Sequence, residues 1–244
     1  LNAYPWEETV KVMNPLAADL GVLRQTLLFG GLESIVRNVN RKAQNLRFFE
    51  VGNVYKYNKE KWTEESPVKA YVQDYHMALW VTGKRVQGSW AHPDEESSFY
   101  ELKAYVENIL HRIGVAQGLL VSEKSDNNVF DKAIALKTRA GKVLVEMGIL
   151  SYRLLKSFGL EQKVYYAELD WAGLMKAIRK NRLQFQEISK YPAVSRDLAL
   201  LVDDKVEFAQ IEEIARQTDK KQLKRVELFD VIRERICRRA RRAM

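Results

Sequence analysis

The 244-residue sequence is poor in the residue types that build metal and disulfide sites. Cys237 is its one cysteine, so the chain can form neither an internal disulfide nor a cysteine-based zinc site. The three histidines, His76, His92 and His111, lie far apart and lack the spacing of metal ligands. We therefore interpret them as solvated or hydrogen-bonded side chains and predict no metal site.

Long apolar runs are also missing. No segment approaches the roughly 18 consecutive apolar residues that a membrane-spanning helix requires. The opening residues, Leu1-Asn2-Ala3-Tyr4-Pro5, lack an initiator methionine and the basic-then-apolar pattern of a signal peptide. These features predict an excised or processed piece of a cytoplasmic protein without a membrane partner.

Catalytic and nucleotide-binding motifs are absent as well. The sequence has no Gly-x-Ser-x-Gly nucleophile elbow, no Walker A phosphate loop and no Gly-x-Gly-x-x-Gly. Gly30-Gly31 at the start of a helical pattern is interpreted as a turn or cap rather than a phosphate site. The adjacent acids of residues 94–96 fit a solvated loop better than an acid/base pair, which needs a pocket and opposed environments.

The sequence does have basic residues, and they are unevenly placed. The net charge is +8, and residues 230–244 carry six arginines against two acids. Half of the net charge therefore comes from a short tail. A basic tail favours contact with nucleic acid without establishing it, so a stand-alone basic RNA-binding protein is kept as an alternative.

The apolar pattern of residues 1–183 predicts an α+β fold built on an antiparallel sheet. The expected strands are 46–58 (bending at Gly52), 76–83, 118–122, 132–138, 143–150 and 163–169, and the expected helices are 27–42, 99–113, 151–157 and 170–179. Residues 59–75 and 84–98 are polar and are expected to be loops. The nearly continuous apolar run of 76–83 indicates a strand that is buried on both faces.

A second pattern begins after a break near residues 181–192. Residues 195–204 alternate like a strand, 206–217 form an amphipathic helix and 223–230 read as another strand. This order is half of a ferredoxin-like βαββαβ unit.

Residues 14–57 and 190–204 resemble the bacterial phenylalanine–tRNA ligase β-subunit family. The family shows Asn-Pro-Leu, Leu-Arg-Thr-Ser-Leu-Leu, a Gly-Leu-Leu helix, an Asn-x-x-Arg turn and Leu-Phe-Glu-x-Gly-x-Val-Tyr. The matching residues are Leu23, Arg24, Leu27, Leu28, Gly31, Leu32, Asn40, Arg41, Phe49, Glu50, Gly52, Val54, Tyr55, Tyr191, Pro192, Arg196 and Asp197. Gln25 and Thr26 depart from the family, which usually has Thr and Ser there.

The resemblance implies a fold and a role. It implies that residues 1–183 are a catalytic-like module with a class II aminoacyl-tRNA synthetase-like antiparallel sheet and flanking helices. Residues 190–230 would be a truncated ferredoxin-like βαβ piece of an anticodon-binding domain. The chain would be a non-catalytic assembly module that pairs with the catalytic α subunit in a heterotetramer, where ATP and Mg²⁺ serve the parent complex. Class II ATP sites use phosphate-binding arginines, and this chain has Lys56 where one is expected.

The resemblance also suggests site residues. Arg24, Leu28, Leu32, Ile35, Asn40 and Arg41, in and beside the first long helix, are candidates for the α-subunit interface. Lys190 and Arg196 are candidates for contact with tRNA(Phe), although Arg196 could equally pair with Asp197. No catalytic, cofactor-binding or metal-binding residue is expected in this chain.

Residues 231–244 do not continue the family pattern. They could be a basic arm for tRNA phosphates. We favour a frameshift, because codons that encode Ile236–Met244 can be read one base out of frame as Asn-Leu-Pro-Ala-Gly-Lys-Lys-Ser-Tyr, which resembles the family. Sequencing the encoding DNA tests this prediction.

Overall fold

The computed structural model describes residues 3–17, 20–116, 118–179, 181, 190–219 and 222–232. The chain divides into two compact units, Leu1–Phe185 and Gln186–Met244. The helices are α1 (Leu28–Asn40), α2 (Phe99–Arg112), α3 (Tyr152–Ser157), α4 (Trp171–Ile178) and α5 (Phe208–Thr218). The strands are β1 (Leu46–Tyr57), β2 (Tyr71–Thr82), β3 (Lys84–Val86), β4 (Glu95–Glu96), β5 (Leu120–Ser125), β6 (Phe130–Thr138), β7 (Val143–Leu150) and β8 (Val164–Asp170).

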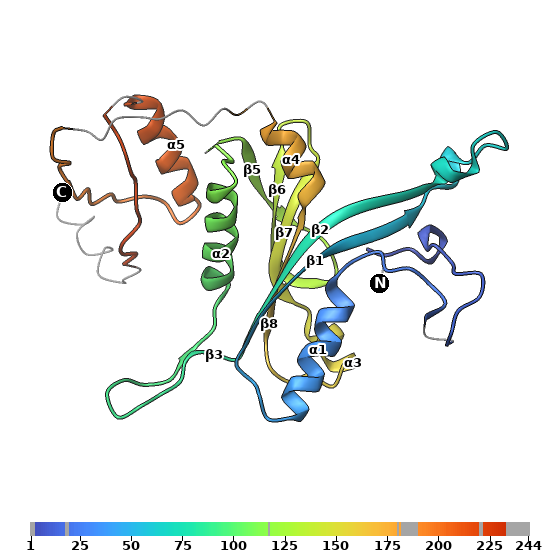
Figure 1. Cartoon of the computed structure of the whole chain (residues 1–244). Coiled ribbons are helices and arrows are strands. Elements are labelled where there is room, and N and C mark those ends of the chain that lie inside the picture. The colour runs from blue at the N-terminus through green and yellow to red at the C-terminus, as the bar shows by residue number, and fades with distance from the viewer. Residues whose placement is uncertain are drawn as a thin grey trace. The chain divides into compact units, whose positions relative to one another are not determined.

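The first unit is built on a six-stranded sheet in the order β1-β2-β8-β7-β6-β5. Every neighbouring pair in this sheet is antiparallel, which confirms the predicted antiparallel sheet. Helices α1 and α3 lie on one face of the sheet, and α2 and α4 lie on the other (Figure 1).

Strand β2 shows why its apolar run is continuous. Ala78 and Trp80 point into the core beneath α1, whereas Leu79 and Val81 point into the core beneath α2. Successive side chains of a strand point to opposite faces, so a strand covered on both sides is apolar at every position. The predicted burial on both faces is confirmed.

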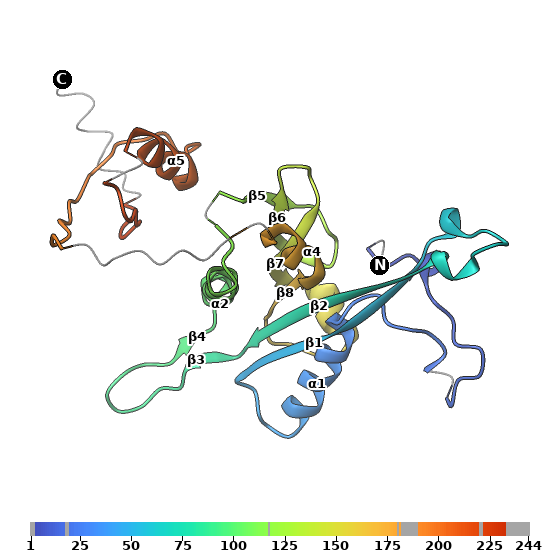
Figure 2. The same ribbon diagram turned by 45° about the horizontal axis from the view of Figure 1, so that its top comes forward.

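Strand β2 begins at Tyr71, five residues before the predicted start. Residues 71–75 pair with β1 but have no partner on their other side, because β8 pairs with His76–Thr82 alone. The outer half of the hairpin therefore extends from the sheet as a two-stranded ribbon (Figure 2). Polar and apolar residues share this ribbon, so the segment looked like a loop in the sequence. Short 3₁₀ helices, Lys59–Lys61 and Pro67–Ala70, lie at its tip.

Helix boundaries follow local hydrogen bonds. Ser98 caps the start of helix α2, because its side chain accepts a hydrogen bond from the amide of Glu101. Gly114, which has a φ of +85°, follows the end of the helix, in agreement with the predicted stop. Asp170 caps α4, as predicted, by accepting a hydrogen bond from the amide of Gly173 (2.7 Å).

The second unit departs from the prediction in its strands. Helix α5 is present, but residues 195–204 and 223–230 form no strand ladder within the described part of the unit. A strand depends on backbone hydrogen bonds to a neighbour, and the described segments do not provide them to each other. Large apolar side chains, including Leu198, Leu201 and Phe229, remain exposed there.

Gly31 sets how closely α1 approaches the sheet. A Cβ atom at this position would overlap the indole ring of Trp80, which is buried in the core. Gly30, one residue earlier, has its nearest neighbouring atom, an oxygen of Glu50, at 3.9 Å from such a Cβ. The two adjacent glycines therefore differ in their packing, although both lie in the same helix.

This difference predicts opposite effects of alanine. We expect Gly31→Ala to lower the free energy of unfolding by about 1–3 kcal/mol, because overpacking moves α1 or Trp80. Gly30→Ala should leave stability unchanged or raise it by up to about 1 kcal/mol, because alanine favours helix. Urea unfolding followed by circular dichroism measures both, and equal effects of the two substitutions would contradict this account of α1 packing.

Candidate functional site

Arg24 ties the segment before α1 to the edge of the sheet. Its Nε donates a hydrogen bond to the carbonyl of Asn53 (2.9 Å), and its guanidinium pairs with Glu50. Its own carbonyl accepts from the amide of Tyr55 (2.8 Å). The guanidinium lies where a Cβ of Gly52 would stand, and β1 pairs with β2 without interruption there. Gly52 thus serves close approach by Arg24, not the predicted bend.

The three apolar interface candidates are core residues. Leu28, Leu32 and Ile35 are fully buried against the sheet. Their side chains have no exposed surface to offer a partner. The physical reason is that the apolar stripe of an amphipathic helix packs first on its own sheet.

The polar candidates do not form one cluster. Arg24 precedes α1, whereas Asn40 and Arg41 lie at its far end, about 18 Å along the helix from Leu28 at 1.5 Å per residue. Asn40 and Arg41 are both exposed. The amide of Arg41 closes the helix on the carbonyl of Asn38 (2.9 Å).

Helix α1 does have an exposed groove, which we call the α1 groove. It is lined by Glu33, Val36, Arg37 and Phe158 and has a volume of about 280 Å³. Glu33 and Arg37 pair across one helical turn (3.7 Å). Phe158 follows α3 and stacks on Phe29 with ring centroids 6.3 Å apart. Phe158 was not among the residues predicted from the sequence, because only the folded structure brings it beside α1.

A buried polar network lies under the start of α1. The carboxylate of Glu168 accepts hydrogen bonds from the hydroxyls of Thr26 and Tyr166, both at 2.6 Å. Its other oxygen lies 2.8 Å from Nδ1 of His76 and 3.4 Å from the amide of Leu27. A carboxylate near a helix N-terminus also interacts favourably with the helix dipole. No pattern in the sequence predicts this network, because its members are up to 142 residues apart.

Burial and hydrogen bonding act in opposite directions on Glu168. Burial would raise the pKa of Glu168. The hydrogen bonds from His76, Thr26 and Tyr166 and the charge of His76 outweigh burial and hold this pKa below its ordinary 4.5. Burial, with the nearby Glu168 carboxylate, raises the pKa values of Tyr4 and Tyr166 well above 10.0. The Glu168 carboxylate is therefore held in its charged form at the centre of this network.

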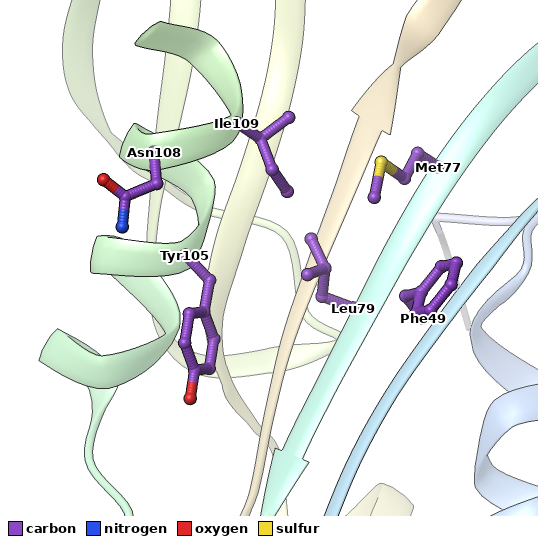
Figure 3. Close-up of a pocket in the computed structure, with 6 residues that line it drawn as sticks. All are labelled: Phe49, Met77, Leu79, Tyr105, Asn108 and Ile109. Carbon is purple, nitrogen blue, oxygen red and sulfur yellow. The ribbon is translucent and has the colours of Figure 1, made fainter. Parts of the chain in front are cut away.

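A second groove lies on the opposite face of the sheet, between β1, β2 and α2 (Figure 3). It has a volume of about 360 Å³ and is lined by Phe49, Met77, Leu79, Tyr105, Asn108 and Ile109. No charged side chain lines it. A triphosphate or an amino acid needs charged partners, so this groove is suited to apolar groups.

The tRNA candidates lie in the second unit. Lys190 and Arg196 are both exposed. In the part of the chain that the structure describes, neither of them pairs with an acidic side chain, and this includes Arg196 and Asp197. Most of the basic tail, residues 233–244, lies outside the described residues, so the frameshift prediction has no structural counterpart.

The described residues lack two further kinds of feature. They contain no group of three or more histidine, cysteine, aspartate or glutamate side chains arranged to hold a metal ion. None of their helices has the length and apolarity to cross a bilayer.

Comparison with known proteins identifies both units. Residues 1–171 match the family model of the phenylalanyl tRNA synthetase beta chain CLM domain. Residues 189–241 match that of the ferredoxin-fold anticodon binding domain. Both models point to one class of protein, the aminoacyl-tRNA synthetases.

Curated proteins that are similar to this chain include several phenylalanine–tRNA ligase β subunits. The chain is 54% identical to that of Bacteroides thetaiotaomicron over 231 residues, which are 95% of the chain and 28% of the relative. It is 46% identical to that of Porphyromonas gingivalis and 32% identical to that of Syntrophotalea carbinolica, again over 28% of each relative. The chain therefore belongs to the phenylalanine–tRNA ligase β-subunit family, and it spans less than a third of the length of these relatives.

The Glu168 network predicts a pH dependence of stability. Because the pKa of Glu168 is lower in the folded protein than in the unfolded chain, the network stabilises the fold above pH 4.5. This stabilisation is lost as the pH falls below 4.5 through the folded-state pKa. Glu168→Gln should lower the free energy of unfolding at pH 7 by about 1–3 kcal/mol and flatten its decline in acid.

Urea unfolding between pH 7 and pH 3 measures this effect. Glu50→Gln is the matched control, because Glu50 makes an exposed ion pair whose loss should cost less than about 1 kcal/mol. An acid decline of the Glu168→Gln variant as steep as that of the unsubstituted chain would contradict the assignment.

Proposed function

We propose that this chain is a non-catalytic structural and assembly module of a phenylalanine–tRNA ligase. In this role it pairs with the catalytic α subunit, which attaches phenylalanine to tRNA(Phe) with ATP, in a cytoplasmic heterotetramer. Membership of the β-subunit family carries the proposal. The alternative of a stand-alone basic RNA-binding protein has no support from these relatives.

The proposal assigns a role to each part. Residues 1–183 are a catalytic-like module with a class II synthetase-like sheet, and residues 190–230 are part of an anticodon-binding domain. Residues 231–244 are proposed to be an aberrant tail, although the family model of the anticodon-binding domain extends to residue 241. The antiparallel sheet with helices on both faces supports the first assignment, and the match of residues 189–241 supports the second.

The uncharged groove supports the non-catalytic part of the proposal. Adenylate formation develops charge on phosphate oxygens, which enzymes stabilise with arginine, lysine or metal ions. The groove beside Phe49 and Leu79 offers none of these side chains. In the proposal, ATP and Mg²⁺ therefore belong to the α subunit and no cofactor is bound by this chain.

The α1 groove is the proposed contact with the α subunit. It replaces Leu28, Leu32 and Ile35 as the direct interface, because those side chains are buried. Val36 and Phe158 provide an apolar floor, and the Glu33–Arg37 pair provides a polar rim. An apolar centre with a polar rim is the usual anatomy of a protein interface. Arg24, Asn40 and Arg41 would lie at its periphery.

Co-purification tests the assembly role. We expect the chain to form a complex with the B. thetaiotaomicron α subunit, and Val36→Asp to weaken that complex at least about tenfold, because it places a charge in the apolar floor. Val121→Asp, at an exposed position of β5, should not affect binding. The chain alone should catalyse no ATP–pyrophosphate exchange. Absence of any complex, or exchange by the chain alone, would sink the proposal.

Binding of tRNA(Phe) tests the second unit. We expect Arg196→Ala and Lys190→Ala each to weaken binding a few-fold and to reduce the salt dependence by about one ionic contact. Arg153→Ala, in the first unit, is the control. Filter binding at several salt concentrations gives both quantities, and unchanged salt slopes would exclude the two residues from phosphate contact.

A further inference from the structure

The segment of residues 3–9 is tied to the residues that precede α1. The side-chain amide of Gln25 donates a hydrogen bond to the carbonyl of Pro5 (2.9 Å). The same amide group donates to the hydroxyl of Thr9 (3.2 Å). One side chain therefore holds this segment at two points, and we call residues 3–9 the N-terminal strap.

Tyr4 is the side chain by which the N-terminal strap enters the core. Its ring packs edge-on against Phe29 of α1, with ring centroids 5.7 Å apart and ring planes at 73°. Burial, and then the charge of the nearby Glu168 carboxylate, raise the pKa of its hydroxyl well above 10.0. The ring of Tyr4 therefore contacts α1, and its hydroxyl lies near the polar network under the start of that helix.

Aromatic contacts continue from Tyr4 to the α1 groove. Phe29 stacks on Phe158, with ring centroids 6.3 Å apart and ring planes at 8°, and Phe158 lines the groove. The three rings come from the strap, from α1 and from the turn after α3, and all of them pack against the same core cluster. We call them the aromatic row. Protein interiors are close-packed, so a ring that leaves this row removes a support from the next one.

The far end of the aromatic row belongs to an element that depends on its neighbours. Helix α3 is only six residues long, and helices this short are not stable by themselves. It is held to the core by Leu154 and Leu155, which are buried. Phe158 follows its last residue and is itself followed by Gly159, which has a φ of +71°. The position of this turn therefore depends on the ring against which Phe158 stacks.

We propose that the N-terminal strap controls the α1 groove through the aromatic row. While Tyr4 is seated on Phe29, the row holds Phe158 and the turn after α3 against α1; release of the strap loosens that turn and changes the shape of the groove. Coupling between two positions is reciprocal, so anything that fixes Phe158 also favours the seated strap. The proposal concerns contacts within the first unit and does not depend on the assembly role proposed above.

Hydrogen exchange of the full chain, followed by mass spectrometry, tests the proposal. We expect Tyr4→Ser to speed exchange in residues 152–160 at least about threefold, because the row loses its first ring. Exchange in residues 99–112 of α2, on the opposite face of the sheet, should stay within about twofold, which separates this effect from a general loss of stability. Trp6→Ser is the matched control, because Trp6 lies in the same strap but is 63% exposed, with its ring near the ammonium of Lys11 (5.7 Å).

Two further variants separate the ring of Tyr4 from its hydroxyl and from the other anchor of the strap. Tyr4→Phe keeps the ring, so exchange in residues 152–160 should stay within about twofold of the unsubstituted chain. Gln25→Ala releases the backbone of the strap without altering the row, and it replaces Tyr4→Ser if that variant does not fold; it should speed exchange in residues 3–9 and 152–160 together. Faster exchange in the strap alone, an equal change in α2, or an effect of Tyr4→Phe as large as that of Tyr4→Ser would each overturn the proposal.

Discussion

The first unit depends on how the carboxylate of Glu168 is held under the start of α1. A buried charge is costly unless hydrogen bonds replace the water it has lost. Here Thr26 comes from the segment before the helix, His76 from β2 and Tyr166 from β8 itself. The carboxylate thus joins two central strands to the beginning of α1. It fixes the point at which α1 starts and, through it, the surface that α1 presents.

The close packing beside this network sets the other limits on α1. Gly31 lets the helix settle on Trp80, and Trp80 lies 5.3 Å from the ring of Tyr166, whose hydroxyl belongs to the Glu168 network. Polar and apolar contacts are therefore continuous beneath the helix. A helix held at its start and along its first turn cannot turn its apolar stripe outward. Its outer face, where Val36 is half-buried at the α1 groove, is the surface on which the proposed contact depends.

The sequence predicted the antiparallel sheet and most of its helices, but not the side-chain contacts that form around α1. Periodicity found α1, α2 and the core strands because burial on a regular element repeats in the sequence. It missed residues 71–75 of β2, where a ribbon without a third strand mixes polar and apolar side chains. It also predicted strands at 195–204 and 223–230, because alternation indicates a preference for extended backbone but does not provide a neighbouring strand.

The residues that match the family explain why the resemblance predicted the fold and not a contact surface. Several of the matching residues have packing roles, such as Leu28 and Leu32 in the core and Gly52 beneath Arg24. The α1 groove instead combines Val36 with Phe158, which are 122 positions apart and carry no joint pattern in the sequence. Core residues are constrained by periodicity along one element, whereas a surface is assembled from several elements. A partner would therefore contact residues that the fold brings together. The α1 groove could be described only once α1 and α3 were placed on the same face of the sheet.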